Sequence, residues 1–232
     1  ALAGEVDVQV AVDSVLTLTG RRVRLLINPG AALSREVLTT GDTVLLDLAA
    51  GVMQVAGNFS ASVSGVIAFS GDLVLDVSRS TRLLSDGKAV QLIEYALHGA
   101  RVTASLSAGN GMDAVVSGAE MALVYARELN GERSWLTTKG SMQALTLAGY
   151  RVDEVSDAAW AMNRAVSAAA QLDGTTIDWS ETRRFALASG RSFVFDQVGD
   201  VFTLPLAGAL QIGDNKIAGN LAATYDRVAH AW

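Results

Sequence analysis

Residues 52–77, VMQVAGNFSASVSGVIAFSGDLVLDV, alternate apolar and polar side chains in two successive runs. Because successive side chains of a strand point to opposite faces of a sheet, the alternation predicts two strands with one buried and one solvated face. Ser64-Gly65 lies between the runs and predicts the turn that joins them. The buried face is expected to carry Phe59, Ala61, Val63, Leu73, Leu75 and Val77.

Similar alternation continues on both sides of this stretch. Asp86-Gly87 and Asn130-Gly131 lie between alternating runs, and the second pair suits a two-residue type I′ hairpin because Asn and Gly tolerate positive φ. Residues 31–38 predict one or two helical turns after the turn Asn28-Pro29-Gly30. The chain is therefore predicted to be mostly β. We expect an elongated repetitive sheet, either an antiparallel meander, which Asn130-Gly131 favours, or β-solenoid-like, with a parallel β-helix as the main rival.

One segment has a different composition. DAAWAMNRAVSAAAQL, residues 157–172, is rich in alanine and contains no glycine or proline. Ser156 or Asp157 can cap the start of a helix here, and Asp173-Gly174 can end it. We therefore predict one helical insert, whose packing side is formed by Trp160, Met162, Val166 and Ala169.

Short motifs recur in the same order in the two halves of the chain. LTLTG at 16–20 returns as LTLAG at 145–149, and FSASVSG at 59–65 returns as FTLPLAG at 202–208. Self-similarity of this kind is typical of arrays whose units pack end to end. It predicts a first β-repeat unit over residues 1–140 and a second, incomplete unit over 141–232 that contains the helical insert.

The composition narrows the class of protein. Half of the 232 residues are hydrophobic, and the net charge of −6 comes without any basic run, so nucleic acid is not expected as a partner. The absence of cysteine rules out disulfides, cysteine metal sites and thiol catalysis. No apolar run approaches the roughly 20 residues of a membrane-spanning helix, so no transmembrane span is expected. Both ends fall within strand patterns, so we expect a fragment or a processed form of a longer protein.

The succession LTLTG, LLINPG, TVLLDLAAGVMQVAGNFSASVSG, FSGDLVLDV, ARVTASLSAGNG, SGAEMALVYA and GSMQALTLAG resembles the strand-rich repeats of giant bacterial secreted and cell-surface proteins, adhesin-like and matrix-like. Those repeats are serial blocks of alternating strands punctuated by glycine. This chain departs from them at Asn28-Pro29-Gly30, which replaces the usual turn, and at 157–172, which is extra. The resemblance implies an extracellular, repetitive and non-catalytic role.

Few residues carry a recognisable catalytic motif. His98 and His230 are the only histidines, and neither has a second histidine or a carboxylate at ligand spacing, so both are expected to be surface or core residues. No serine lies in a Gly-x-Ser-x-Gly elbow. Glu5/Asp7 and Asp72/Asp76 are paired carboxylates on polar strand faces, without a clustered Lys or Arg, and a solvated face is expected.

Acidic turns are the candidate calcium sites. They are Asp86-Gly87, residues 110–113, Asp173-Gly174 and residues 213–215. Calcium binds six to eight oxygens, and none of these turns has the acidic density of a known calcium loop. The residues suit turns for their backbone tolerance. No cofactor is therefore expected, and Ca²⁺ at a joint between units is the alternative.

These observations favour a structural module over an enzyme. We expect a non-catalytic part of an extracellular assembly, an adhesin stalk, sheath or matrix fibre, whose partners are neighbouring copies or repeats and, beyond them, a cell surface or glycan. A carbohydrate-active β-helix enzyme and a lipid-carrying β-groove protein of the envelope are the alternatives. Terminal strands can join copies by strand addition. The expected assembly residues are Val6, Val8, Val10, Val12, Leu221, Ala223, Tyr225 and Trp232.

Overall fold

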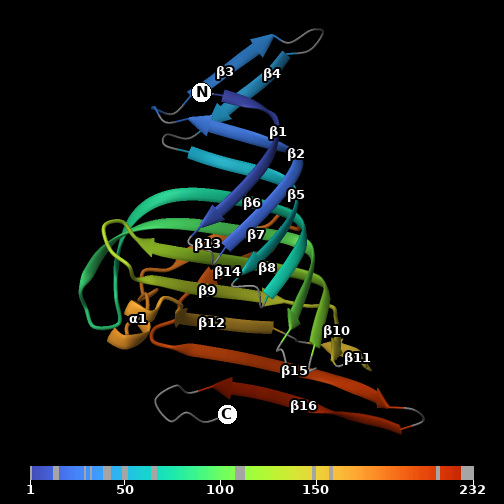
Figure 1. The fold of residues 1–232 in the computed structure, drawn as a ribbon. Helices are drawn as coiled ribbons and strands as arrows, with labels where there is room; N and C mark the ends of the chain where they lie inside the picture. The colour runs from blue at the N-terminus through green and yellow to red at the C-terminus, as the bar shows by residue number, and fades with distance from the viewer. Residues whose placement is uncertain are drawn as a thin grey trace.

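A computed structural model of the chain describes residues 2–12, 16–28, 30–31, 33–38, 43–48, 52–63, 67–107, 113–147, 150–156, 159–212 and 215–225. Twelve strands within these ranges form one sheet (Figure 1). They are β1 (Leu2–Val12), β2 (Leu16–Asn28), β5 (Val52–Val63), β6 (Ile67–Leu83), β7 (Ala89–Ser107), β8 (Asp113–Glu128), β9 (Ser134–Ser141), β10 (Ala144–Leu147), β11 (Tyr150–Ser156), β12 (Ala159–Ala165), β15 (Val201–Ile212) and β16 (Asn215–Tyr225).

Three smaller elements complete the described structure. β3 (Leu33–Leu38) pairs with β4 (Thr43–Leu48), β13 (Arg183–Ala186) pairs with β14 (Ser192–Phe195), and α1 (Ala168–Asp173) is the one helix of the described residues. Among the described residues, no helix has the length and apolar character needed to cross a membrane.

The sheet is an antiparallel meander. β9 and β10 continue one another, because both pair with β8 in a single register from Arg127↔Ser134 to Ala114↔Leu147. On their far side β12 pairs with β9 and β11 pairs with β10, and both β11 and β12 pair in turn with β15. Every pairing between described strands is antiparallel, which confirms the predicted mostly β fold and excludes the parallel β-helix for this part of the chain. The predicted unit boundary near residue 140 falls where β9 leads into β10, and the division into units stays a prediction.

A series of register breaks bends this sheet. The breaks fall between Val6 and Val8 on β1, Gly20 and Arg24 on β2, Ser70 and Asp72 on β6, and Gly99 and Ala104 on β7. Bulges bend a strand and increase its twist, so a series of them bends the sheet. Figure 1 shows the long strands β6, β7 and β8 curving together.

The backbone at these breaks is unusual. Arg22, Arg101 and Gly118 have φ values of 51°, 57° and 63°, in the left-handed region that residues other than glycine rarely adopt. Gly99 is needed for a different reason: a Cβ there would lie 2.2 Å from the carbonyl oxygen of Asp72 on β6. Glycine thus permits the close approach of β6 and β7 at the bend.

We predict that Gly99→Ala lowers the free energy of unfolding by ~2 kcal/mol or more, because the added methyl group must displace the backbone of a neighbouring strand. Urea unfolding followed by circular dichroism measures the change. Gly4→Ala on β1 is the matched control, since a Cβ there meets nothing within 4 Å. Equal stability of the two variants would contradict the close approach.

The inner face of the sheet, defined as the face that carries the larger core, is strongly apolar. The alternation in residues 52–77 is confirmed there, because Phe59, Leu73 and Leu75 are buried while Ser60 and Asp72 on the opposite face are exposed. The inner core extends across the bend from β2 to β12. Its members include Leu16, Leu18, Val23, Val55, Phe69, Leu97, Val102, Leu123, Tyr125 and Met162.

The outer face is covered where β7, β8 and β9 run. There α1, residues 174–182 and the β13–β14 hairpin pack on the sheet and form a second core that includes Leu92, Val124, Trp135, Trp179 and Phe195. Both buried tryptophans are also anchored by hydrogen bonds: Trp135 Nε1 donates to the Thr175 carbonyl and Trp179 Nε1 donates to Thr137 Oγ1, each at 2.9 Å. Sheet and cover therefore form one packed body.

The predicted helix is wrong over most of its range. Residues 159–165 form β12, and the helix is confined to Ala168–Asp173. The reason is that β12 has two buried faces: Met162 joins the inner core, whereas Ala165 joins the outer one. This packing overrides the helical preference of alanine. The expected end is confirmed, since Gly174 adopts φ 66° and caps the helix, while Ser167 caps its start.

Two other local predictions are corrected. Residues 33–38 form strand β3 rather than helical turns, because they pair with β4. Asn130-Gly131 is not a two-residue type I′ turn: the loop spans 129–133, and neither residue has positive φ. The Glu128 amide donates to the Arg133 carbonyl at 2.9 Å, so Asn130-Gly131 lie at the centre of this longer loop, and the chain reverses where it was predicted to. Asp86-Gly87 does lie in the β6–β7 turn, with Gly87 at φ 81°. Ser64-Gly65 lies outside the described residues.

Candidate functional site

The predicted assembly strands lie at the two edges of the sheet. β1 pairs only with β2, and β16 pairs only with β15, within the part of the chain that the structure describes. Figure 1 shows β16 at one extreme of the sheet and β1 near the other. The structure thus separates the two sets of predicted residues, and Trp232 lies outside the described residues.

The edge strand β1 has one apolar face and one acidic face. Val6 and Val8 pack against the inner core but are only half-buried, whereas Glu5, Asp7 and Gln9 are exposed. In β16, the register pairs Leu221, Ala223 and Tyr225 with Leu206, Leu204 and Phe202 of β15. Val10 and Val12 are placed in β1 by their backbone, opposite Leu18 and Leu16.

A cluster of charges that was not predicted lies under the β13–β14 hairpin. Its centre is Glu94 on β7, whose side chain is 1% exposed. Arg82 Nε of β6 donates to Glu94 Oε1 at 2.9 Å, and the Arg183 guanidinium of β13 donates to Glu94 Oε2. We call Glu94, Arg82 and Arg183 the Glu94 cluster. It ties the cover to the sheet by charge as well as by packing.

Burial changes the acid–base behaviour of the cluster. The pKa of Arg183 is lowered to about 10, chiefly by burial away from water and also by the positive charge of Arg82, while Asp76 acts in the opposite direction. Burial likewise lowers the pKa of Arg82. Each guanidinium also stacks on an aromatic ring, Arg82 over Trp179 and Arg183 over Phe185, both at 4.8 Å from the ring centroid. Ring faces attract cations, which offsets part of the lost hydration.

Asp76 and His98 form a second polar contact beside this cluster. His98 Nε2 lies 3.2 Å from Asp76 Oδ2, and Gln54 Nε2 donates to Asp76 Oδ1 at 3.0 Å. No carboxylate partner for His98 was predicted from its neighbours in the sequence. The partner, Asp76, comes from the adjacent strand β6. Burial alone would raise the pKa of Asp76, but the hydrogen bonds from His98 and Gln54 and the nearby positive charges hold it below its usual value. His230 lies outside the described residues.

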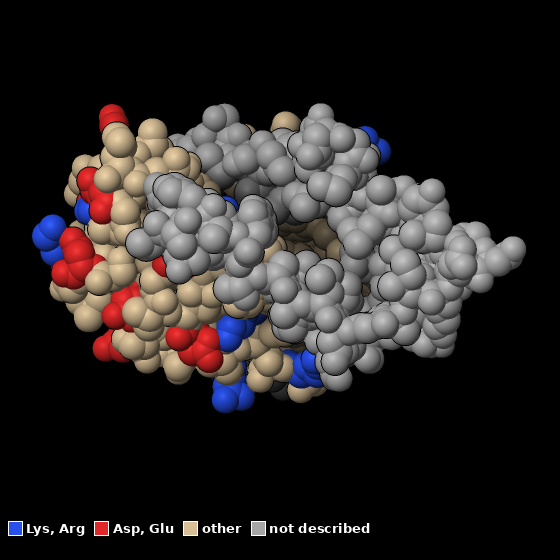
Figure 2. All heavy atoms as spheres, turned by 90° about the horizontal axis from the view of Figure 1, so that it is seen from below, with Lys and Arg blue, Asp and Glu red and all other residues tan. Residues whose placement is uncertain are grey.

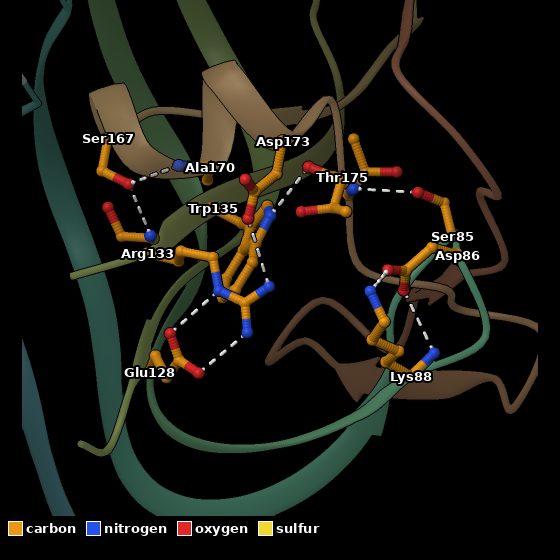
Figure 3. Close-up of polar contacts among 12 residues, drawn as sticks. Ser85, Asp86, Lys88, Glu128, Arg133, Trp135, Ser167, Ala170, Asp173 and Thr175 are labelled. Carbon is orange, nitrogen blue, oxygen red and sulfur yellow. Dashed lines mark hydrogen bonds and ion pairs between the residues drawn. The ribbon is translucent and has the colours of Figure 1, made fainter. Parts of the chain in front are cut away.

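Two of the four candidate calcium turns, Asp86-Gly87 and Asp173-Gly174, are described, and each carboxylate pairs with a basic side chain of the chain itself. Residues 110–112 and 213–214 of the other two turns lie outside the described residues. Figure 3 shows Asp86, Glu128 and Asp173 near Lys88 and Arg133. Arg133 forms a two-pronged ion pair with Glu128, at 2.9 and 2.8 Å, and reaches Asp173 at 3.5 Å. Lys88 pairs with Asp86 at 2.9 Å. No group of three potential metal ligands is found within the described ranges.

The remaining paired carboxylates do not converge. Asp72 of β6 pairs with Arg101 of β7 at 2.8 Å, and both side chains are largely exposed. Asp76 lies four residues further along β6 and is held by His98 and Gln54. Glu5 and Asp7 belong to the distant β1 edge, where Asp7 Oδ1 accepts the Arg22 amide at 2.9 Å.

Two adjoining pockets lie on the outer face at the bend. Their volumes are about 220 and 540 Å³, and they share Gly118, Glu120 and Gln143 as lining residues. Arg191, from the end of the β13–β14 turn, lies 2.8 Å from Glu120 Oε2 and donates to Ser141 Oγ at 3.2 Å. The pocket carboxylate is therefore covered by a guanidinium whose side chain is 62% exposed.

Comparisons with protein families, with curated proteins and with solved structures found no match to this chain. The resemblance to repeats of giant surface proteins stays a prediction.

We predict that Glu94→Ala lowers the free energy of unfolding by about 3 kcal/mol, because it removes a fully buried carboxylate from two partly buried arginines. Asp72→Ala is the matched control and should change stability by less than about 1 kcal/mol, since it breaks only an exposed pair. Urea unfolding compares them. A Glu94→Ala variant as stable as the control would show that the cluster contributes nothing.

Asp76 should make stability depend on pH in the acid range. Its folded pKa lies below the unfolded value of about 3.9, so its contribution is complete above that value and is lost as the pH falls through the folded pKa. The difference in unfolding free energy between wild type and Asp76→Asn should shrink as the pH falls below about 4. A difference that grows as the pH falls below about 4 has the opposite sign and would refute the assignment.

Proposed function

We propose that this chain is a non-catalytic structural module of an extracellular assembly, such as an adhesin stalk, a sheath or a matrix fibre. The observation that carries the proposal is the single antiparallel sheet whose two outermost strands, β1 and β16, are each paired on one side only within the described residues. Unpaired strand edges present rows of backbone donors and acceptors, to which a further strand can add. Each of these strands has 11 residues.

The charged residues support a structural reading. Glu94 is paired with both Arg82 and Arg183 beneath the hairpin, and Glu128 is paired with Arg133. Carboxylates held in this way stabilise a fold and are poorly placed to exchange protons with a substrate. On the face drawn in Figure 2, acidic and basic side chains are interspersed over the described part rather than gathered in a patch of one sign. Such a surface suits a solvated scaffold.

The two alternatives have less support. A carbohydrate-active enzyme requires carboxylates that converge on one substrate. Asp72, Asp76 and Glu120 are instead each engaged by a different basic side chain, Arg101, His98 and Arg191. A lipid carrier requires an open apolar groove, whereas the inner-face residues Leu18, Phe59 and Leu73 are at most 1% exposed.

The proposal predicts self-association. Analytical ultracentrifugation over a wide concentration range, with negative-stain electron microscopy of the same samples, should detect oligomers that grow into regular fibres as concentration rises. A monomer at every concentration, with dispersed single particles in the images, would overturn the proposal. Extraction of those particles for lipid and glycan would then test the two alternatives directly.

A further inference from the structure

We infer that copies of this chain join head to tail, with β16 of one copy adding antiparallel to β1 of the next. The inference rests on the proposed function and specifies its joint. It commits to one partner, a second copy of this chain, and to one pair of edges. Three independent features of the described residues carry it: the directions of the edge strands, the burial of the β1 valines, and the charges on the two edges.

The first feature is strand direction. From β1 to β16 the sheet follows the path β1-β2-β5-β6-β7-β8-β10-β11-β15-β16, and each of its nine steps is antiparallel. Nine reversals leave β16 running opposite to β1. A second copy that follows the first in the same sense therefore offers its β1 antiparallel to β16, and the joint repeats the pairing found throughout the sheet.

The second feature is incomplete burial at the β1 edge. Val6 and Val8 pack against the inner core, yet they remain half-buried. Val23, the partner of Val6 on β2, is 0% exposed, and β2 has a strand on both sides. A strand added to the outer side of β1 would supply the missing neighbour and continue the inner core. Burial of these valines favours association through the hydrophobic effect.

The third feature is charge. β1 carries Glu5 and Asp7, both exposed, whereas the only charged residue of β16 is Lys216. Two copies of β1 paired antiparallel about Asp7 would place that carboxylate opposite its own counterpart, and like charges directly opposite one another are unfavourable. The edge charges thus oppose a twofold β1–β1 joint and allow the β1–β16 joint.

A joint between two different edges repeats without closing unless the rotation per copy brings the ends together. Adjacent strands are rotated by roughly 20–25° relative to one another, so a sheet continued from copy to copy keeps twisting in one sense. We therefore expect an open, twisted filament whose strands lie across its axis. This is the arrangement that electron microscopy should find if the joint is correct.

The test uses single-cysteine variants, because the chain has no cysteine of its own. Gln9→Cys marks β1, Asn220→Cys marks the middle of β16, and Thr103→Cys, exposed on the central strand β7, is the matched control. Pairs of variants are mixed at equal concentration and treated with a short bismaleimide. We expect dimers joined through positions 9 and 220 in excess over dimers that contain position 103, and over dimers of either edge variant with itself.

A dominant product joining position 9 to position 9 would overturn the inference in favour of a twofold joint. Fibres in the microscope without the 9–220 product would also overturn it, while leaving the structural function intact. A monomeric protein that forms neither fibres nor cross-links would overturn both the β1–β16 joint and the proposed structural function.

A second variant tests the same joint without chemistry. Val8→Lys places a charge on the inward side of the β1 edge, which opposes strand addition. It should lose the high-mass species of the wild type, whereas Thr103→Lys should keep them. Circular dichroism of both variants checks that the fold is retained, and a folded Val8→Lys variant that still forms wild-type fibres would count against β1 as the joint.

Discussion

The bend in the sheet is the constraint on which the rest of the fold depends. Without the register breaks, strands as long as β6 and β7 would bend less and leave more of their apolar face exposed to water. The breaks fold that face onto itself and bury the inner core from Leu16 to Met162. The cost is local: a few residues accept left-handed backbone, and two strands approach closely enough at Gly99 to exclude any side chain there.

The outer cover buries the second apolar face of the sheet. Strands β7 to β9 are apolar on both faces, so the face that points away from the inner core also needs a partner. α1 and the β13–β14 hairpin supply it, and they are fixed by two kinds of contact. Hydrogen bonds from Trp135 and Trp179 fix residues 174–182, which connect α1 to the hairpin. The ion pairs of the Glu94 cluster fix the hairpin itself.

Much of this could be predicted from alternation alone. The strands of residues 52–77 and the β6–β7 turn at Asp86-Gly87 follow from local pattern, because strand periodicity and turn preference are properties of neighbouring residues. The segment 159–165 could not be assigned in this way, since its strand is imposed by packing on both faces. The Glu94 cluster and the Asp76–His98 contact depend on register between strands. One signal was present nevertheless: Glu94 and His98 are isolated polar residues within the apolar run of β7, and such residues require partners when buried.

The meander has a consequence for how the chain acquires its structure. Almost every long strand pairs with the next long strand along the sequence, so the loops that must close are short for a sheet of this size. Low sequence separation between contacts favours fast folding, and it allows pairing to begin before the whole chain is available. During synthesis each new strand can dock on the edge left by the one before it. The sheet would thus gain strands in the order in which they leave the ribosome, beginning with the N-terminal ones.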